Sequence, residues 1–201
     1  MSEENGFFEG IIVAAYAHEE AAEDASQRVE AAKKEGTFDY WDAAVIRIDE
    51  RGRYYIHESK DMSTPKGAGI GALVGGVIGI VGGPAGVVLG SGLGAAIGMF
   101  AANSDRGIKD ERFEEVGHAL ESGNSALIIV SGHEYLQQLQ EYAGEDELEI
   151  AMQKLTDSIH EHMEHDQDVA YIVTAAGRSV SCHRLRNETI LDLLGLGEAA
   201  E

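Results

Sequence analysis

The sequence predicts an α+β fold, in which helices cover an antiparallel sheet and a glycine-rich helical hairpin is inserted into the domain. Three observations support this prediction. Apolar runs of strand length occur at residues 11–16 and 126–130, as is typical of strands in the middle of a sheet. Segments with the apolar spacing of amphipathic helices alternate with strand-like segments. No charged residue lies between Lys66 and Asp105, although 25% of the chain is charged.

The first half of the chain indicates a strand, a helix and a strand pair. After the strand at 11–16, a stripe of small apolar residues predicts a helix at 19–34, which Gly36 ends. Alternating apolar residues at 41–49 and 54–59 predict a strand pair. A second amphipathic helix, marked by Phe113, Val116, Gly117 and Leu120, precedes the strand at 126–130.

Without the hairpin, this order is β-α-β-β-α-β, which is the ferredoxin-like arrangement with two helices on one face of an antiparallel sheet. We expect residues 1–64 and 105–132 to form the two parts of this domain, with the hairpin at 65–104 between them. In this arrangement the strand at 126–130 lies at an edge of the sheet. An open apolar edge needs a cover, which residues 133–201 or a second subunit would provide.

The C-terminal extension, residues 133–201, indicates a short helix near 134–142, a longer helix near 146–164 and strands at 169–174 and 179–186. A short amphipathic tail follows Asn187, a candidate N-cap. The tail either packs back on the sheet as a helix or serves as a docking peptide for a partner protein. The apolar residues that would dock are Ile190, Leu191, Leu193, Leu194 and Leu196.

The uncharged stretch at 65–104 contains two series of glycines spaced four residues apart, which predicts two helices with bare faces. Pro65 and Pro84 each suit the first position of a helix. An interior glycine costs about 0.8–1.0 kcal/mol relative to alanine in a solvated helix, so these helices need lipid or close packing to form. The predicted helix-packing residues are Gly67, Gly71, Gly75, Gly79 and Gly83, and Gly82, Gly86, Gly90, Gly94 and Gly98.

The length of the hairpin suits a bilayer. Residues 65–82 and 84–102 would each span about 27 to 28 Å as helices, against roughly 30 Å for the hydrocarbon core. Lysines and arginines flank both ends of the hairpin, which predicts that these ends lie on the cytoplasmic side of the inner membrane. The alternative is a soluble hairpin buried in an oligomer, and the lack of Trp or Tyr anchors at the hairpin ends favours it. The flanking cations are Lys60, Lys66, Arg106 and Lys109.

Composition argues against several classes of function. With 36 acidic against 15 basic residues and a net charge of −21, the chain lacks the basic surface that nucleic-acid binding needs. The single Cys182 excludes an internal disulfide and suits a reducing compartment. The acidic N-terminus has no long apolar core, so we predict no signal peptide.

The sequence does not indicate catalytic chemistry. His160, His162 and His165 lie close together and are weak metal candidates. A solvated helix face explains His160 and His165 more simply, and His162 continues the apolar stripe of the predicted helix. Cys182 and His183 are neighbours in a predicted strand and therefore point to opposite faces. His18 stands where the first helix starts and is a candidate cap. No serine-hydrolase, zinc-protease or phosphate-loop motif is present, so we expect no enzyme activity, no resident metal and no cofactor.

Several segments together resemble a known family. They are IIVAAY with its helix, WDAAVIRIDERGRYYIHE, STPKGAGIGALVGGVIGIVGGPAGVVLGSGLGAAIG and KDERFEEVGHALESGNSALIIV. The chain resembles the bacterial and archaeal family known as domain of unknown function twelve-sixty-nine from about Gly10 to Ser131, and departs from it from Glu145 onwards. The resemblance implies a membrane protein with no established activity.

These observations lead to one functional expectation and two alternatives. We expect a non-catalytic scaffold that associates with the membrane, or with copies of itself, through the glycine-zipper hairpin. The first alternative is a soluble homo-oligomer, in the cytoplasm, that binds a small ligand or acts in stress. The second is a cargo or client protein that is recruited through its C-terminal tail.

Overall fold

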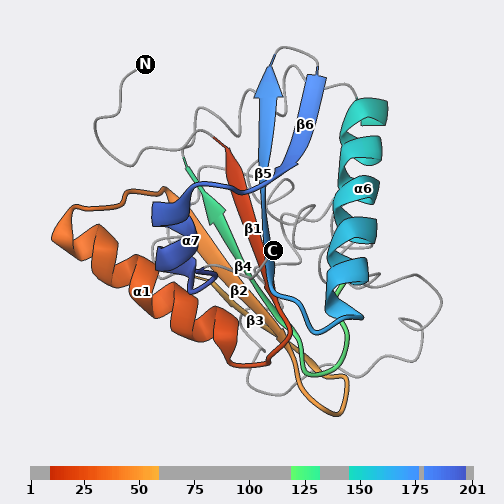
Figure 1. The fold of residues 1–201 in the computed structure, drawn as a ribbon, viewed down its shortest axis with the longest axis horizontal. Helices are drawn as coiled ribbons and strands as arrows, with labels where there is room; N and C mark the ends of the chain where they lie inside the picture. The colour runs from red at the N-terminus through yellow and green to blue at the C-terminus, as the bar shows by residue number, and fades with distance from the viewer. Residues whose placement is uncertain (1–9, 59–118, 132–144, 177–178, 198–201) are drawn as a thin grey trace.

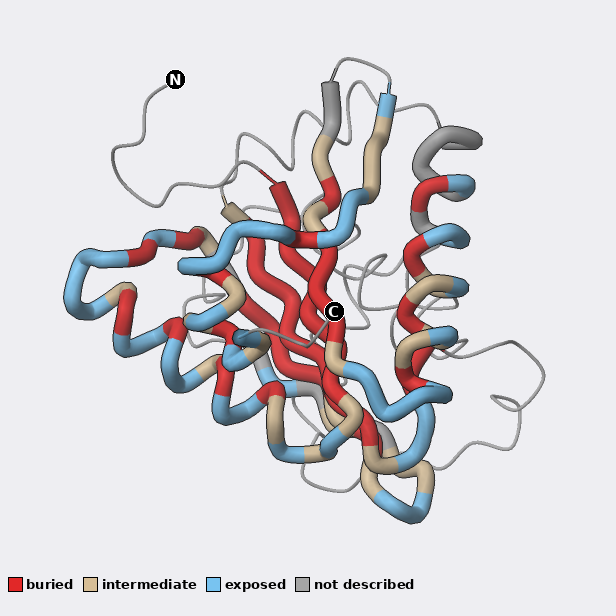
Figure 2. Tube along the Cα trace, viewed as in Figure 1, coloured by how far each residue is buried: buried red, intermediate tan, exposed pale blue. Residues whose placement is uncertain are grey.

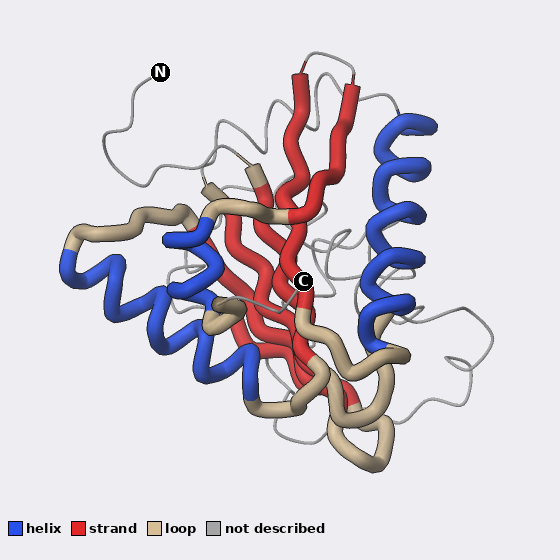
Figure 3. The backbone as a smooth tube through the Cα atoms, in the orientation of Figure 1, coloured by secondary structure: helices blue, strands red, loops and turns tan. Residues whose placement is uncertain are grey.

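The computed structural model describes residues 10–58, 119–131, 145–176 and 179–197. In these residues, six strands form one sheet and three helices cover it (Figure 1; helices blue and strands red in Figure 3). The predicted α+β class is therefore confirmed. The elements are β1 (Ile11–Tyr16), α1 (Ala21–Glu35), β2 (Asp42–Ile48), β3 (Tyr54–Glu58), β4 (Ser125–Val130), α6 (Glu145–Met163), β5 (Val169–Ala176), β6 (Ser179–Arg184) and α7 (Glu188–Leu194).

The strand order is β3-β2-β4-β1-β5-β6, and every pair of neighbours is antiparallel. β4 lies in the middle, where Ile128 is opposite Val13 of β1 and Ala44 of β2. The prediction that this strand is an edge is wrong. All six residues of β4 are buried, and a strand that is apolar on both faces is stable only with neighbours on both sides.

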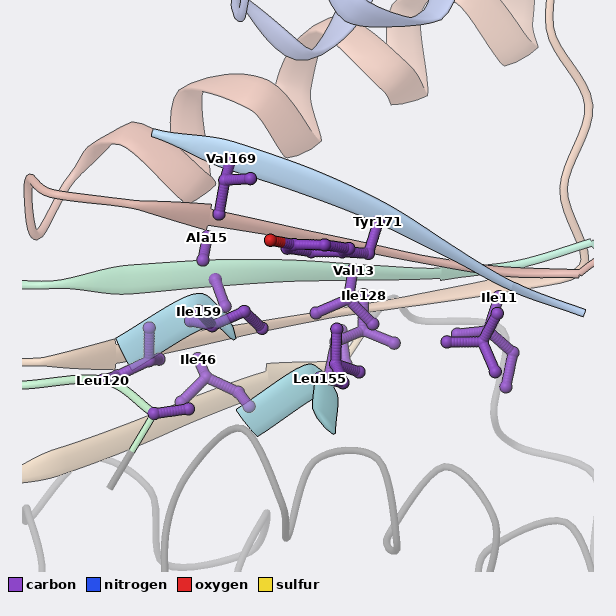
Figure 4. Close-up of a cluster of buried hydrophobic side chains, with 14 of the residues drawn as sticks. Ile11, Val13, Ala15, Ile46, Leu120, Ile128, Leu155, Ile159, Val169 and Tyr171 are labelled. Atoms are coloured by element: carbon purple, nitrogen blue, oxygen red, sulfur yellow. The ribbon is translucent and has the colours of Figure 1, made fainter. Parts of the chain in front are cut away.

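Alternate residues of the strands point to opposite faces of the sheet, and each face has its own core. Ile11, Val13 and Ala15 of β1 pack in the cluster that includes Leu155 and Ile159 of α6 (Figure 4). The residues between them, Ile12, Ala14 and Tyr16, pack in the cluster of α1 and α7. The central strands are accordingly buried along their length (Figure 2).

The C-terminal extension completes the sheet. β5 pairs with β1 along Ile11 to Ala15, and β6 pairs with β5. The predicted long helix and the two predicted C-terminal strands are confirmed as α6, β5 and β6, whereas the short helix expected at 134–142 lies outside the described residues. Residues that follow the predicted domain therefore supply the neighbour of β1 on the side away from β4.

The two crossovers in this sheet have opposite hand. The first runs from β1 through α1 to β2, and the second runs from β4 through α6 to β5. Their helices lie on opposite faces (Figure 1), whereas a ferredoxin-like fold has both on one face. Most of the helix expected near 113–120 lies outside the described residues. Its last two positions, Ala119 and Leu120, are buried in the cluster on the α6 side.

The start of α1 is capped by a distant residue. Glu20, at the N-cap position, makes no capping bond with its side chain. Instead the hydroxyl of Ser125, at the start of β4, accepts a bond from Ala22 N at 3.1 Å and donates to His18 O at 2.6 Å. The predicted role of His18 is thus taken by Ser125, which is fully buried. At the other end, Gly36 adopts a φ of 72° and closes the helix, as predicted.

Replacing Ser125 by alanine should destabilise the domain. The change leaves Ala22 N and His18 O without this partner, and a buried unsatisfied group costs about 1–3 kcal/mol. Urea denaturation of Ser125→Ala should show a lower midpoint with an unchanged slope. Ser179→Ala, at an exposed position of β6, is the control and should match the parent. Equal midpoints for all three proteins would mean that Ser125 does not hold the start of α1.

Candidate functional site

The turn between β2 and β3 holds a compact group of charged side chains. Oδ1 of Asp49 accepts bonds from the backbone N of Arg51 and of Arg53, both at 2.9 Å. Its other oxygen, Oδ2, accepts a bond from Arg53 Nε at 2.6 Å. Partial burial acts to raise the pKa of Asp49, but the hydrogen bonds from Arg53 and Arg51 outweigh it and lower that pKa from 3.8 to about 2. The carboxylate therefore closes the turn in its charged form.

An aromatic ring links this turn to the start of α1. Arg47 lies 4.3 Å above the ring of Tyr55, and Arg53 lies 5.6 Å from the same ring. Arg47 Nη1 also donates to Glu19 Oε1 at 2.6 Å. Two of the three arginines of the β2–β3 strand pair are thus paired with carboxylates, so the charge of these two is largely neutralised within the domain. These contacts hold the β2–β3 strand pair in position rather than form an anion site.

The stabilising effect of Asp49 should depend on pH. Because folding lowers its pKa from 3.8 to about 2, its contribution is fully present above about pH 4 and is lost as the pH falls toward 2. The difference in thermal midpoint between the parent and Asp49→Asn should be largest near pH 6 and shrink below pH 4. Asp39→Asn, which changes an exposed carboxyl in another loop, is the control. A difference that stays constant over this range would contradict the assignment.

The three candidate metal-binding histidines do not form a site. His162 and His165 each use Nδ1 to donate to the carbonyl four residues earlier, on Ser158 and Glu161, at 2.7 Å. His160 Nε2 lies 3.6 Å from Glu164 Oε1 on the solvated side. Among the described residues, no group of three or more His, Cys, Asp or Glu side chains could hold a metal ion. His165 is exposed, whereas His160 and His162 are half-buried, and the ring of His162 lies on the side of α6 that meets Tyr171 of β5.

A second polar contact lies between α6 and β5. The hydroxyls of Ser158 and Tyr171 are hydrogen-bonded to each other, and the ring of His162 packs edge-on against Tyr171 with centroids 6.5 Å apart. Burial raises the pKa of Tyr171. Burial also raises the pKa of the Cys182 thiol, to about 11, so this cysteine stays protonated at neutral pH and is a poor nucleophile.

The C-terminal tail packs back on the domain as α7. Ile190 and Leu194 are buried in the cluster on the α1 side, and Leu191, Leu193 and Leu196 pack against that cluster. Asn187 caps the start of the helix through a bond from Ile190 N at 3.1 Å. Docking of this tail on a partner protein stays a prediction, and a partner would have to displace contacts that the tail makes within its own chain.

Two side chains hold the end of α7, and the sequence did not indicate either of them. Arg28 of α1 donates through Nε to Leu193 O at 3.0 Å and through Nη2 to Leu194 O at 2.9 Å. Tyr16 of β1 donates to Leu194 O at 2.9 Å, and burial raises the pKa of its phenol. Cations and donors stabilise the free carbonyls at the end of a helix. The sequence carries no local signal for these bonds, because the partners are more than 160 positions apart.

Removing the Arg28 guanidinium should loosen α7. Arg28→Met loses two bonds to carbonyls, and we expect a loss of about 1 kcal/mol in the free energy of unfolding and faster amide exchange across α7. Lys34→Met, on an exposed part of the same helix, is the matched control. Unchanged exchange in Arg28→Met would mean that apolar contacts alone hold α7 in place.

The remaining predicted site residues belong to the glycine-rich segment. The ten helix-packing glycines, from Gly67 to Gly98, lie outside the described residues. Among the described helices, none has both the length and the apolar character needed to cross a bilayer.

One comparison with known proteins identifies a family. The family model described as "Protein of unknown function (DUF1269)" matches residues 68–167. The match includes most of the glycine-rich stretch, β4 and α6. The expectation that the chain departs from the family from Glu145 onwards is therefore corrected for residues 145–167, while residues 168–201 lie outside the matched range. The resemblance expected for residues 10–67 falls outside the matched range. No curated protein and no solved structure matches this chain.

Proposed function

This chain belongs to the DUF1269 family of proteins of unknown function, and we propose that it is a non-catalytic scaffold that self-assembles at the cytoplasmic side of the inner membrane through a glycine-zipper hairpin at residues 65–104. The insertion of this hairpin into the sheet domain, between β3 and β4, belongs to the same proposal. In this function the hairpin anchors and assembles the protein, and the folded domain serves as a platform.

One observation carries the proposal. β3 and β4 both pair with β2 in one sheet, and residues 59–118 join these two strands along the chain. In sequence, the most apolar stretch of the chain therefore separates two strands of the same sheet, which supports its interpretation as an insertion. The family model begins at residue 68, within this stretch, so the glycine-rich segment is part of what defines the family.

The electrostatics of the described domain also favour a scaffold over an enzyme. A catalytic carboxylate or histidine usually has a pKa near the working pH and a polar environment open to substrate. Asp49 instead has a lowered pKa and serves a turn, and Tyr16 and Cys182 have raised pKa values because they are buried. In each case the shift favours the state that is already stable at neutral pH.

Bulky residues on the glycine faces should abolish assembly. In Gly75→Leu combined with Gly90→Leu, the side chains would keep the helix backbones from approaching closely. We expect carbonate washing to release the double variant from the membrane pellet, or the variant to lose its oligomeric state in detergent. The parent should stay in the pellet and stay oligomeric. Gly75→Ala with Gly90→Ala keeps the faces small and should behave as the parent.

A second control separates the glycine faces from general disturbance of the hairpin. Ile78→Leu combined with Val88→Leu changes large residues that are expected to face lipid, and it should leave retention and assembly unchanged. If the glycine-to-leucine variant matches the parent in both assays, the glycine faces are not packing surfaces. If the parent itself is released from membranes by carbonate, the soluble homo-oligomer is the better description.

A further inference from the structure

The topology fixes the end of the sheet from which the glycine-rich segment departs. β3 and β4 are each antiparallel to β2, so they run in the same direction. The chain therefore leaves β3 at one end of the sheet, at Glu58, and enters β4 at the opposite end. The same end as Glu58 holds the start of β1 and the end of β4, at the top of Figure 1. We call it the Glu58 end.

The loop before β2 places an aromatic group at the Glu58 end. Trp41, the only tryptophan in the chain, donates from its backbone N to Val130 O at 2.8 Å, where β4 finishes. Its side chain is partly exposed and packs against the edge of the core on the α6 side. Because Phe38 and Tyr40 beside it are buried, Trp41 is the aromatic residue of this loop that solvent reaches.

The loop is held in place by a lysine. Lys33 Nζ donates to Tyr40 O at 2.6 Å and lies 4.1 Å from the centre of the Tyr40 ring. Trp41 is therefore presented from a fixed backbone rather than from a loose turn.

A second apolar group lies at the same end. Ile150 is 56% exposed and is the one exposed large hydrophobic side chain among the described residues. It belongs to the first two turns of α6, which begin near the top of Figure 1. A partly exposed tryptophan and an exposed isoleucine thus lie at the end from which the most apolar stretch of the chain departs.

We propose that the Glu58 end of the sheet faces the lipid surface, with Trp41 anchored in the headgroup region of the bilayer and Ile150 in contact with it. This inference rests on the membrane association proposed above. Tryptophan favours the interface because its ring is apolar and its N–H is polar. The sequence shows no aromatic anchor at the ends of the hairpin itself, and the fold supplies one from a segment distant in sequence.

The charges at this end favour a zwitterionic surface. Lys33 and Lys34 are balanced by Glu35 and Asp39 in the same helix end and loop, and Lys34 is also paired with Glu30 at 3.1 Å. The first two turns of α6, which carry Ile150, add four acidic residues and make this end net negative: Glu145, Asp146, Glu147 and Glu149. Electrostatic attraction to anionic lipid is therefore small.

The single tryptophan allows a direct test with the full-length protein. It is bound to phosphatidylcholine vesicles with plain or brominated acyl chains, and tryptophan emission is compared in the sedimented fraction. We expect bromination to reduce the emission of Trp41 by about half, with a shift to shorter wavelength. The control, Trp41→Phe with Tyr55→Trp, places the fluorophore about 20 Å along the sheet at 3.4 Å per residue, and its emission should not change.

The outcomes separate the two proposals. Protein that stays in the supernatant would overturn membrane association, and this inference with it. Protein that sediments while Trp41 is not quenched, or while the Tyr55→Trp control is quenched as strongly, would overturn the orientation alone and would favour a hairpin packed against copies of itself. Trp41→Phe with Ile150→Trp provides a second reporter at the Glu58 end, and quenching of it supports the orientation even if the Tyr55→Trp control fails to fold.

Discussion

The pairing of β4 between β1 and β2 is the interaction on which the rest of the domain depends. All six residues of β4 are buried, and six positions of β1 and six of β2 face it across the sheet. Burial of apolar area on both faces stabilises the strand, and two complete ladders satisfy its backbone groups. Since α1 packs on one face of this unit and α6 on the other, the central strand gives both helices their positions.

The polar contacts lie at positions where apolar burial leaves backbone groups without hydrogen-bond partners. Helix ends and turns leave carbonyls and amides without partners in the local chain. Ser125 serves the start of α1, Asp49 closes the turn between β2 and β3, and Arg28 with Tyr16 serves the end of α7. Each of these groups would be costly to leave unpaired when buried. This use accounts for side chains that, from their type alone, suggest chemistry.

The same topology that completes the sheet also gives the domain two different ends. Parallel running of β3 and β4 requires the inserted segment to leave at one end and to return at the other. Trp41 and Ile150 lie at the departure end, together with the acidic residues of the first turns of α6. In the proposed orientation, this departure end is the one that contacts lipid.

Sequence by itself determined the α+β class and most of the elements. Apolar runs marked β1 and β4, a stripe of small residues marked α1, and a longer stripe marked α6, because periodicity reports how each segment will be buried. Gly36 also marked a helix end, since its positive φ suits glycine.

Only the tertiary structure decided which strands are neighbours and which side chains meet. The central place of β4, the contacts of Arg28 with α7 and the position of Trp41 at the departure end join segments far apart in the chain. A local pattern shows that a segment will be buried but not what will cover it. That choice depends on the packing of the whole sheet.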